Sequence, residues 1–328
     1  MFLLAGAGSA FAADEIRPGQ LWYDTKGHVI NAHGGGVFHH EGTYWWYGEH
    51  KVYGGAGNRA HVGVHAYSSK DLVNWDDRGV ALAVTDHGDI EDGSVIERPK
   101  VLRNPKTGKW VMYFHLELKG QGYRAARVGI AVADRPQGPF TFLRSLRPNG
   151  AMSRDMTLFV DDDGKAYHIF ASEENRTTHI DALTEDYLDY TGESWRVFEN
   201  DSTEAAAICK HDGWYFIIGS GCTGWAPNEA RLYRAKALKG PWTRLGNPCT
   251  GVNPQNNLGP EKTWGGQSNF LLTVAGQPDN VIAMFDIWKP KNQIDSRYVW
   301  LPVVFKDDRL EIPWQDAWKP TVGQGLRP

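Results

Sequence analysis

The sequence predicts an all-β protein, and more narrowly a five-bladed β-propeller. The first observation is a turn that ends in glycine, except in one looser copy, and leads into a run of apolar or aromatic residues. It occurs five times, as in EGTYWWYGE from residue 41 and DGWYFIIGS from residue 212, with a looser last copy from residue 277. Such turns before β-rich runs are typical of hairpins. The second observation is that no long stretch with helical periodicity interrupts them.

An apolar step precedes each hairpin and marks the start of a unit. The five units start near residues 33, 97, 154, 204 and 267. Each holds about four short strands, and repeats of this length and strand content are typical of propeller blades. A pair of β-sandwiches is the alternative, which the regular spacing disfavours. Because no linker or low-complexity segment divides the chain, we expect one domain over residues 13–328.

The N-terminal segment MFLLAGAGSAFAADEI is apolar and ends in Ala10-Phe11-Ala12. This pattern matches the apolar region and the cleavage site of a secretory signal, although the usual basic start is missing. We therefore expect a signal peptide over residues 1–12 and a secreted or periplasmic protein. The segment is too short to span a bilayer, so no membrane association is expected.

Composition excludes some partners and favours others. The net charge of −4 provides no basic surface for nucleic acid. The 14 tryptophans and 13 tyrosines suit either a β-rich core or the binding of sugars, because both residue types have an apolar face and a polar tip. The three cysteines do not form a disulfide framework.

Polar residues open the first strand of every predicted unit. In a propeller these strands line the central axis, so their first side chains face one funnel. The five residues are His33, Glu97, Asp155, Glu204 and Gln267. We therefore expect a site at one end of the axis, close to aromatic residues.

Four longer motifs resemble family 43 glycoside hydrolases. They are VIERPKVLRNPKTGKWVMYFH, SRDMTLFVDDDGKAYHIFAS, STEAAAICKHDGWYFIIGSGCTGWAPN and SRYVWLPVVF. The resemblance is closest to the galactan-active branch, which contains exo-β-1,3-galactanases and related β-galactosidases. It covers nearly all of the chain after the N-terminal segment. It implies a five-bladed propeller that hydrolyses glycosides with inversion of the anomeric centre.

The resemblance implies three catalytic residues. Glu204 matches the general acid, and desolvation at the start of an apolar strand would raise its pKa. Glu97 matches a carboxylate that tunes the pKa of the acid, although an ion pair with Arg98 is an alternative role for Glu97. No carboxylate occurs from residue 31 to residue 38, where most members of the family have the base. The galactan-active branch shares this loss and has a glutamine that matches Gln267, which would position the attacking water or act through its imidic tautomer.

The same resemblance and the neighbouring sequence predict the residues that hold the sugar. The expected substrate-binding residues are His33, Gly34, Glu49, Tyr123, Asp155, Asn175, Thr223, Trp225 and Asn228. Gly34 would allow the backbone to approach the sugar because it has no Cβ. His33 would form a hydrogen-bonding wall.

The predicted function is an inverting, exo-acting glycoside hydrolase that releases galactose from β-1,3-galactan or related β-galactosides. The expected partner is a β-galactan or a galacto-oligosaccharide, and the oligomeric state is open. One alternative is an α-L-arabinofuranosidase or β-xylosidase of the same family, which the missing first-blade aspartate disfavours. The other is a sugar-binding propeller without catalysis, which the presence of Glu97 and Glu204 disfavours.

We expect no cofactor and no metal. The DDDG turn at residues 161–164 lacks the alternating ligands of a calcium loop. No histidines have the spacing of zinc ligands.

Overall fold

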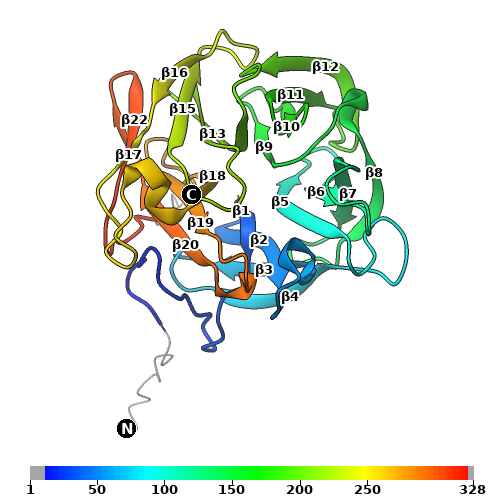
Figure 1. Ribbon diagram of the computed structural model, residues 1–328, viewed down its shortest axis with the longest axis horizontal. Coiled ribbons are helices and arrows are strands. Elements are labelled where there is room, and N and C mark those ends of the chain that lie inside the picture. The colour runs from blue at the N-terminus through cyan, green and yellow to red at the C-terminus, as the bar shows by residue number, and fades with distance from the viewer. Residues whose placement is uncertain (1–11, 324–328) are drawn as a thin grey trace.

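The computed structural model describes residues 12–323, which form strands and four short 3-10 helices. The sheets surround a central axis in a propeller arrangement (Figure 1). The predicted all-β fold agrees with this arrangement. Residues 1–11 of the expected signal peptide lie outside the described residues. None of the helices in the described part of the chain has the length and apolar character needed to cross a membrane.

Four sheets are antiparallel meanders of four strands each. The first contains β1 (His33–His40), β2 (Thr43–Lys51), β3 (His61–Ser69) and β4 (Asp76–Ala83). The second contains β5 (Val95–Arg103), β6 (Trp110–Glu117), β7 (Arg127–Ala133) and β8 (Thr141–Leu146). The third contains β9 (Met156–Val160), β10 (Ala166–Ser172), β11 (Thr177–Leu183) and β12 (Tyr190–Val197). The fourth contains β13 (Thr203–His211), β14 (Trp214–Gly221), β15 (Ala230–Ala235) and β16 (Thr243–Gly246).

The prediction of five blades is wrong, because the described residues form six sheets in a six-bladed arrangement. The fifth sheet has three strands, β18 (Gln267–Thr273), β19 (Val281–Ile287) and β20 (Arg297–Pro302). The sixth contains β17 (Cys249–Thr250), β21 (Val304–Lys306) and β22 (Arg309–Pro313). After β20 the chain does not add a fourth strand to the fifth sheet. It turns into the β21–β22 hairpin, and β22 pairs in parallel with β17.

Two local features explain why this sixth sheet was not predicted from the sequence. The turn of its hairpin, Asp307-Asp308, contains no glycine, although Asp307 has a φ of 50°. Its third strand, β17, has only two residues and comes from the segment between the fourth and fifth predicted units. The small sheet lies at the outer edge of the molecule, whereas β1, β5, β9, β13 and β18 surround the axis (Figure 1).

Apolar side chains fill the space between neighbouring sheets. Trp46, Trp75 and Trp300 are fully buried between the first and fifth sheets, and equivalent clusters separate the other pairs. Burying each such side chain contributes roughly 1.5–3 kcal/mol or more relative to leaving it exposed. Much of the aromatic content is therefore core. The three cysteines are free.

Four of the five inner strands have an irregularity close to their first residues. Register shifts interrupt β1 after His33, β5 after Glu97, β13 after Glu204 and β18 after Ser268. Arg98 and Ala205, in two of these bulges, both have a φ of 55°. A bulge changes the direction of a side chain and is frequent next to functional sites. Here the bulges accompany the polar residues that open the strands.

Candidate active site

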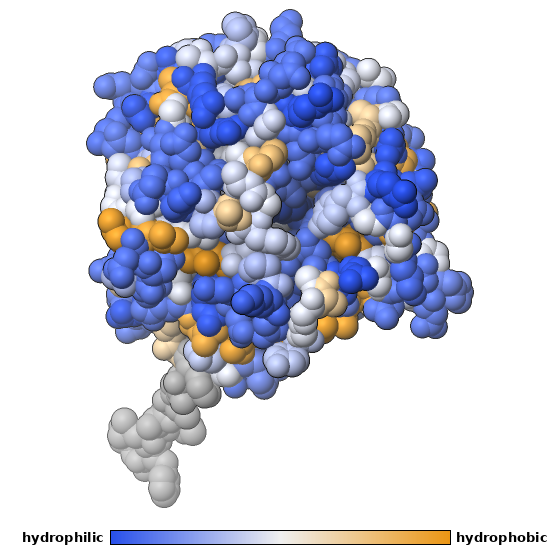
Figure 2. Space-filling view, in the orientation of Figure 1, coloured by the Kyte–Doolittle hydropathy of each residue, from blue (hydrophilic) through white to orange (hydrophobic). Residues whose placement is uncertain are grey.

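A cavity of about 330 Å³ lies where the inner strands begin. The face seen in Figure 2 is hollowed near the centre, and hydrophilic side chains surround the hollow. Eight of the residues predicted from the sequence line the cavity. They are Glu49, Glu97, Tyr123, Asp155, Asn175, Glu204, Trp225 and Gln267. The strand starts of four sheets therefore do converge on one site.

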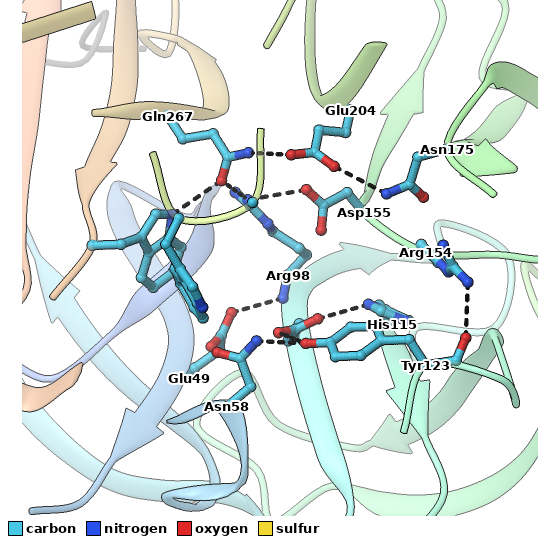
Figure 3. A pocket seen from close by; sticks show the side chains of 14 residues that line it. Glu49, Asn58, Arg98, His115, Tyr123, Arg154, Asp155, Asn175, Glu204 and Gln267 are labelled. Atoms are coloured by element: carbon cyan, nitrogen blue, oxygen red, sulfur yellow. Dashed lines mark hydrogen bonds and ion pairs between the residues drawn. The ribbon is translucent and has the colours of Figure 1, made fainter. Parts of the chain in front are cut away.

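Glu204 lies on one wall of the cavity without a cation bound to it. The amide groups of Gln267 and Asn175 each donate a hydrogen bond of 3.0 Å to its carboxyl oxygens (Figure 3). Among the described residues, no lysine, arginine or histidine forms an ion pair with Glu204. Burial, followed by the negative charge of Asp155, raises the pKa of Glu204 to about 7. A carboxyl group with this pKa suits a general acid at neutral pH.

Asn175 reaches Glu204 from an unusual turn. Glu173, Glu174 and Asn175 have successive φ values of 52°, 58° and 62°. Left-handed backbone is unfavourable for most residues, and runs of it occur where the surroundings impose it, often at functional sites. Arg154 supports this turn through an ion pair of 2.6 Å with Glu174. The turn thus presents the Asn175 amide to the acid.

Glu97 lies in a different electrostatic environment. Its partner across the β5–β6 ladder is His115, whose Nδ1 is 2.8 Å from Glu97 Oε2. His115 Nε2 is in turn 3.0 Å from Glu117, and Tyr123 donates a hydrogen bond of 2.8 Å to Glu97 Oε1. Burial alone would raise the pKa of Glu97, but the hydrogen bond and charge of His115 lower it to about 2. Glu97 is therefore ionised at all ordinary pH values.

His115 is protonated by the same arrangement. Burial favours the neutral imidazole, but the hydrogen bonds of Glu117 and Glu97 outweigh burial and raise the pKa of His115 to about 9. Glu97, His115 and Glu117 therefore form a buried carboxylate–imidazolium–carboxylate chain. We name these three residues the Glu97 chain.

Arg98 connects several blades around the cavity. Its backbone N–H donates to Glu49 Oε1 at 3.0 Å, and Glu49 also forms an ion pair of 2.5 Å with Lys51. Its side chain forms an ion pair of 3.1 Å with Asp155 and donates a hydrogen bond of 2.5 Å to Gln267 Oε1. The alternative considered for Glu97, an ion pair with Arg98, is not formed. Arg98 pairs with Asp155, and Glu97 pairs with His115.

Four predicted residues do not line the cavity. His33 is buried, stacks on Tyr298 with ring centroids 4.8 Å apart, and lies 3.3 Å from Asp286. At Gly34, whose φ is 62°, a Cβ would come within 2.1 Å of Glu49 Oε1, so the glycine makes room for that carboxylate.

Thr223 and Asn228 shape the loop that carries Trp225. Asn228 donates hydrogen bonds to the Gly221 carbonyl at 2.8 Å and to the Thr223 hydroxyl at 2.7 Å. Thr223 donates to the carbonyl of Ala226. A contact of these side chains with substrate stays a prediction.

Several other residues of the cavity wall were not predicted from the sequence as site residues. They are Asn58, Arg98, His115, Arg154, Gly224 and Trp288. His115 lies directly opposite Glu97 in the β5–β6 ladder, so the strand register would have found it. Trp288 follows β19, and no local pattern distinguishes it from the many core tryptophans.

One group of side chains in the cavity has a composition that suits a metal ion. Glu97, His115 and Asp155 offer ligand atoms within 4.8 Å of one another. Both ring nitrogens of His115 already face carboxylates, and the raised pKa of His115 opposes metal binding, which requires a neutral imidazole. The group therefore fits an ion-pair chain better than a metal centre.

Known proteins resemble this chain over most of its length. A family 43 β-1,3-galactosidase with galactodeoxynojirimycin is 45% identical, covers 93% of this chain and 100% of its own, and gives a TM-score of 0.88. The exo-β-1,3-galactanase of Phanerochaete chrysosporium, with β-1,3-galactotriose, is 35% identical over 94% of this chain and 69% of its own, with a TM-score of 0.85. The exo-β-1,3-galactanase of Clostridium thermocellum is 36% identical over 96% and 68%, with a TM-score of 0.85.

Two curated relatives match shorter segments. Xylosidase/arabinosidase 43A of Humicola insolens is 41% identical over 95 residues, which are 26% of this chain and 27% of that protein. The xylosidase/arabinosidase of Bacteroides ovatus is 33% identical over 113 residues, 32% of this chain and 31% of that protein. The chain thus matches only about a quarter to a third of the length of these curated relatives.

The family-level match covers more of the chain than either of these two matches. The model of glycosyl hydrolases family 43 matches residues 34–277, a range that includes Glu49, Glu97, Asp155, Glu204 and Gln267. The chain belongs to glycosyl hydrolases family 43.

Proposed function

We propose that the protein is an exo-acting glycoside hydrolase that removes galactose from the end of β-1,3-galactan or related β-galactosides. The observation that carries this proposal is Glu204, a carboxyl group with a pKa near 7 in a small polar cavity. Glu49, which forms an ion pair with the buried Lys51, lines the wall of this cavity. Solved relatives with 35–45% identity are β-1,3-galactosidases and exo-β-1,3-galactanases.

In the proposed reaction Glu204 donates its proton to the glycosidic oxygen while the bond from that oxygen to the anomeric carbon breaks. A water molecule attacks the opposite face of the sugar, so the product is first released as α-galactose. The attacking water passes its proton to a carboxylate of the cavity, and the ionised Glu97 is our candidate for this acceptor. Asp155 raises the pKa of Glu204 and so keeps the acid protonated.

Other residues of the cavity are suited to hold the sugar. Glu49, Glu97 and Asn175 offer groups that can bind sugar hydroxyls. The rings of Trp225 and Trp288 stand 6.2 Å apart at 70° and offer an apolar wall for the flat face of galactose. Trp225 is 45% exposed, so it is accessible to a ligand.

A second candidate activity is release of arabinose or xylose. The curated relatives in Humicola insolens and Bacteroides ovatus are xylosidase/arabinosidases. The absence of a carboxylate from residue 31 to residue 38 disfavours this candidate, as it did from the sequence alone.

We also propose that the protein is exported, because residues 1–12 have the pattern of a secretory signal. Cell fractionation of the producing organism tests this directly. Activity confined to the cytoplasm would contradict it.

The experiment is a screen of nitrophenyl glycosides together with β-1,3-galactan, with the released monosaccharide identified. We expect galactose from the β-galactoside and from the polymer, and roughly 10²–10⁴-fold slower release from the polymer by the Glu204→Gln variant. Proton NMR of fresh product should show the α anomer first. Release of arabinose or xylose alone, or initial release of β-galactose, would contradict the proposal.

A further inference from the structure

The side chain of Gln267 has no unused hydrogen-bonding group. Its carbonyl oxygen accepts hydrogen bonds from Arg98 Nη2 at 2.5 Å and from Trp288 Nε1 at 3.0 Å. Its amide nitrogen donates to Glu204 Oε1 and to Ser220 Oγ, both at 3.0 Å. A side-chain amide offers two acceptor sites and two donor hydrogens. All four are occupied, so Gln267 is held in one orientation (Figure 3).

The two donors on the carbonyl also determine the tautomer of Gln267. A guanidinium group and an indole N–H can only donate hydrogen bonds. The imidic tautomer carries a proton on this oxygen, and that proton would point at two other donors. Only the amide form satisfies the contacts that the structure shows.

Arg98 and Trp288 are themselves fixed. Arg98 Nη1 donates to the Ser268 carbonyl and to Asn269 Oδ1, both at 3.0 Å, and its Nη2 also meets Asp155. The guanidinium carbon lies 5.5 Å from the centre of the Trp288 ring, which places the cation against the indole. Arg98 is 5% exposed, so neither solvent nor rotation competes easily with these bonds.

We propose that Arg98 and Trp288 are positioning residues that hold Gln267 as an amide, with its N–H group on Glu204, so that Gln267 supports the acid rather than serving as the base. This inference rests on the proposed function of the same cavity. It differs from the role expected from the sequence, in which Gln267 positions the attacking water.

The hydrogen bond from the Gln267 amide to Glu204 should speed the transfer of the proton. When Glu204 transfers its proton to the glycosidic oxygen, it becomes a carboxylate. A hydrogen bond to a carboxylate is shorter and about twice as strong as one to a neutral group. The Gln267 N–H therefore stabilises the transition state more than the resting acid, which is the condition for a faster chemical step.

Distance supports the same assignment. Inverting glycosidases usually hold the acid and the group that activates water about 6.5–9.5 Å apart, so that sugar and water fit between them. Gln267 is in direct contact with Glu204 at 3.0 Å. In this position Gln267 lies on the side of the acid.

The first test measures the pKa of Glu204 by ¹³C NMR of carboxyl-labelled glutamate in the substrate-free protein. Gln267→Met keeps the size and burial of the side chain but removes its N–H group. Since that N–H favours the ionised acid, we expect its loss to raise the pKa of Glu204 by about one unit. An unchanged or lower pKa in Gln267→Met would overturn the proposal.

The second test distinguishes a positioning role of Trp288 from a general effect of replacing a tryptophan. Trp288→Phe removes only the indole N–H and part of the ring, and should raise the pKa of Glu204 in the same direction by a smaller amount. Trp242→Phe is the matched control, because the Trp242 indole donates to the Leu238 carbonyl, far from this cavity. The control should leave the pKa of Glu204 unchanged. Equal shifts in the two variants would refute a specific role for Trp288.

The third test determines the tautomer of Gln267 directly by ¹⁵N NMR. In protein labelled with ¹⁵N-glutamine, the signal absent from Gln267→Met belongs to Gln267. We expect two protons on this nitrogen, as in an amide, whereas a single proton would show the imidic form and overturn the proposal. None of the three measurements uses a substrate. If galactan is not hydrolysed, the proposed function fails while these results still decide the role of Gln267.

Discussion

Two glutamates line the same cavity in different electrostatic surroundings. Glu97 is paired with the protonated His115 and accepts a hydrogen bond from Tyr123. Glu204 touches two amide groups and has no cationic partner among the described residues. The pKa is about 2 for Glu97 and about 7 for Glu204.

This contrast shows that neighbours, rather than residue type or burial, decide the protonation state. Both glutamates lie near the start of an inner strand and precede a bulge, and Glu97 is buried whereas Glu204 is partly buried. Burial raises the pKa of each, and only Glu97 has a cation that outweighs burial. One carboxyl group is thereby kept as an acid and the other as an anion, a division of roles frequent in glycosidases.

The largest effect is expected when the acid is removed. Glu204→Gln keeps the shape of the side chain but cannot donate a proton to the leaving oxygen. Hydrolysis of galactan should fall roughly 10²–10⁴-fold. Nitrophenyl galactoside should lose less activity, because nitrophenolate leaves without much protonation. Equal losses on the two substrates, measured as kcat, would contradict the acid role.

The next largest effect is expected when the Glu97 chain is broken, and this effect is on the stability of the protein. His115→Gln leaves two buried carboxylates without their shared cation, and should lower the free energy of unfolding by about 3–5 kcal/mol. Denaturant unfolding measures this loss, with His87→Gln as an exposed control. The control should change stability little.

The same variant makes a prediction about pH. The pKa of His115 is about 9 in the folded protein and near its ordinary value in the unfolded chain, so folding is stabilised by its protonation. This stabilisation is complete below about pH 6.5 and disappears as pH rises through about 9. The difference in unfolding free energy between the native protein and His115→Gln should therefore shrink over that range. A difference that stays constant with pH would contradict protonation of His115.

A smaller change is expected from the charge beside the acid. Asp155→Asn removes the negative group that raises the pKa of Glu204 after burial, and leaves Arg98 without its carboxylate partner. Both effects lower the pKa of Glu204. The alkaline limb of the pH profile of kcat/KM should therefore move below its native midpoint near pH 7. A limb that stays in place would assign the raised pKa to burial alone.

The smallest effect concerns the thiol next to the acid. Cys222 lies against Glu204, and burial, followed by the charge of Glu204, raises the pKa of this thiol to about 12. A neutral thiol is only a weak hydrogen-bond donor. Cys222→Ala should change kcat by less than about threefold, which is about 0.6 kcal/mol. A loss comparable to that of Glu204→Gln would show that Cys222 takes part in the chemistry.

The sequence was sufficient to predict most of the strands and four of the five polar residues expected in the funnel, all except His33. Hairpin turns and apolar steps depend on neighbouring residues, so they can be read locally, and they placed Glu97, Glu204 and Gln267 at starts of inner strands. The number of sheets could not be read in this way. The sixth sheet depends on β22 pairing with the two-residue β17, a contact between segments about 60 residues apart.

The partners of each site residue were also beyond the sequence. Arg98 follows Glu97 directly, yet the bulge between them sends Arg98 to Asp155 and Gln267. His115, which keeps Glu97 ionised, was not predicted as a site residue. Its position opposite Glu97 follows only from the strand register. Gly34 was expected at the sugar and instead makes room for Glu49. These partners depend on packing between blades.

The most direct test of the contrast between the two glutamates is a pH titration of both in one sample. Carboxyl-labelled glutamate can be followed by ¹³C NMR from about pH 3 to pH 9, with Glu204→Gln and Glu97→Gln used to assign the two signals. We predict that Glu204 titrates with a midpoint near 7 and that Glu97 stays ionised throughout this range. If both carboxyl groups titrated together near pH 4–5, their different neighbours would not set their protonation, and the assignment of Glu204 as the acid would be contradicted.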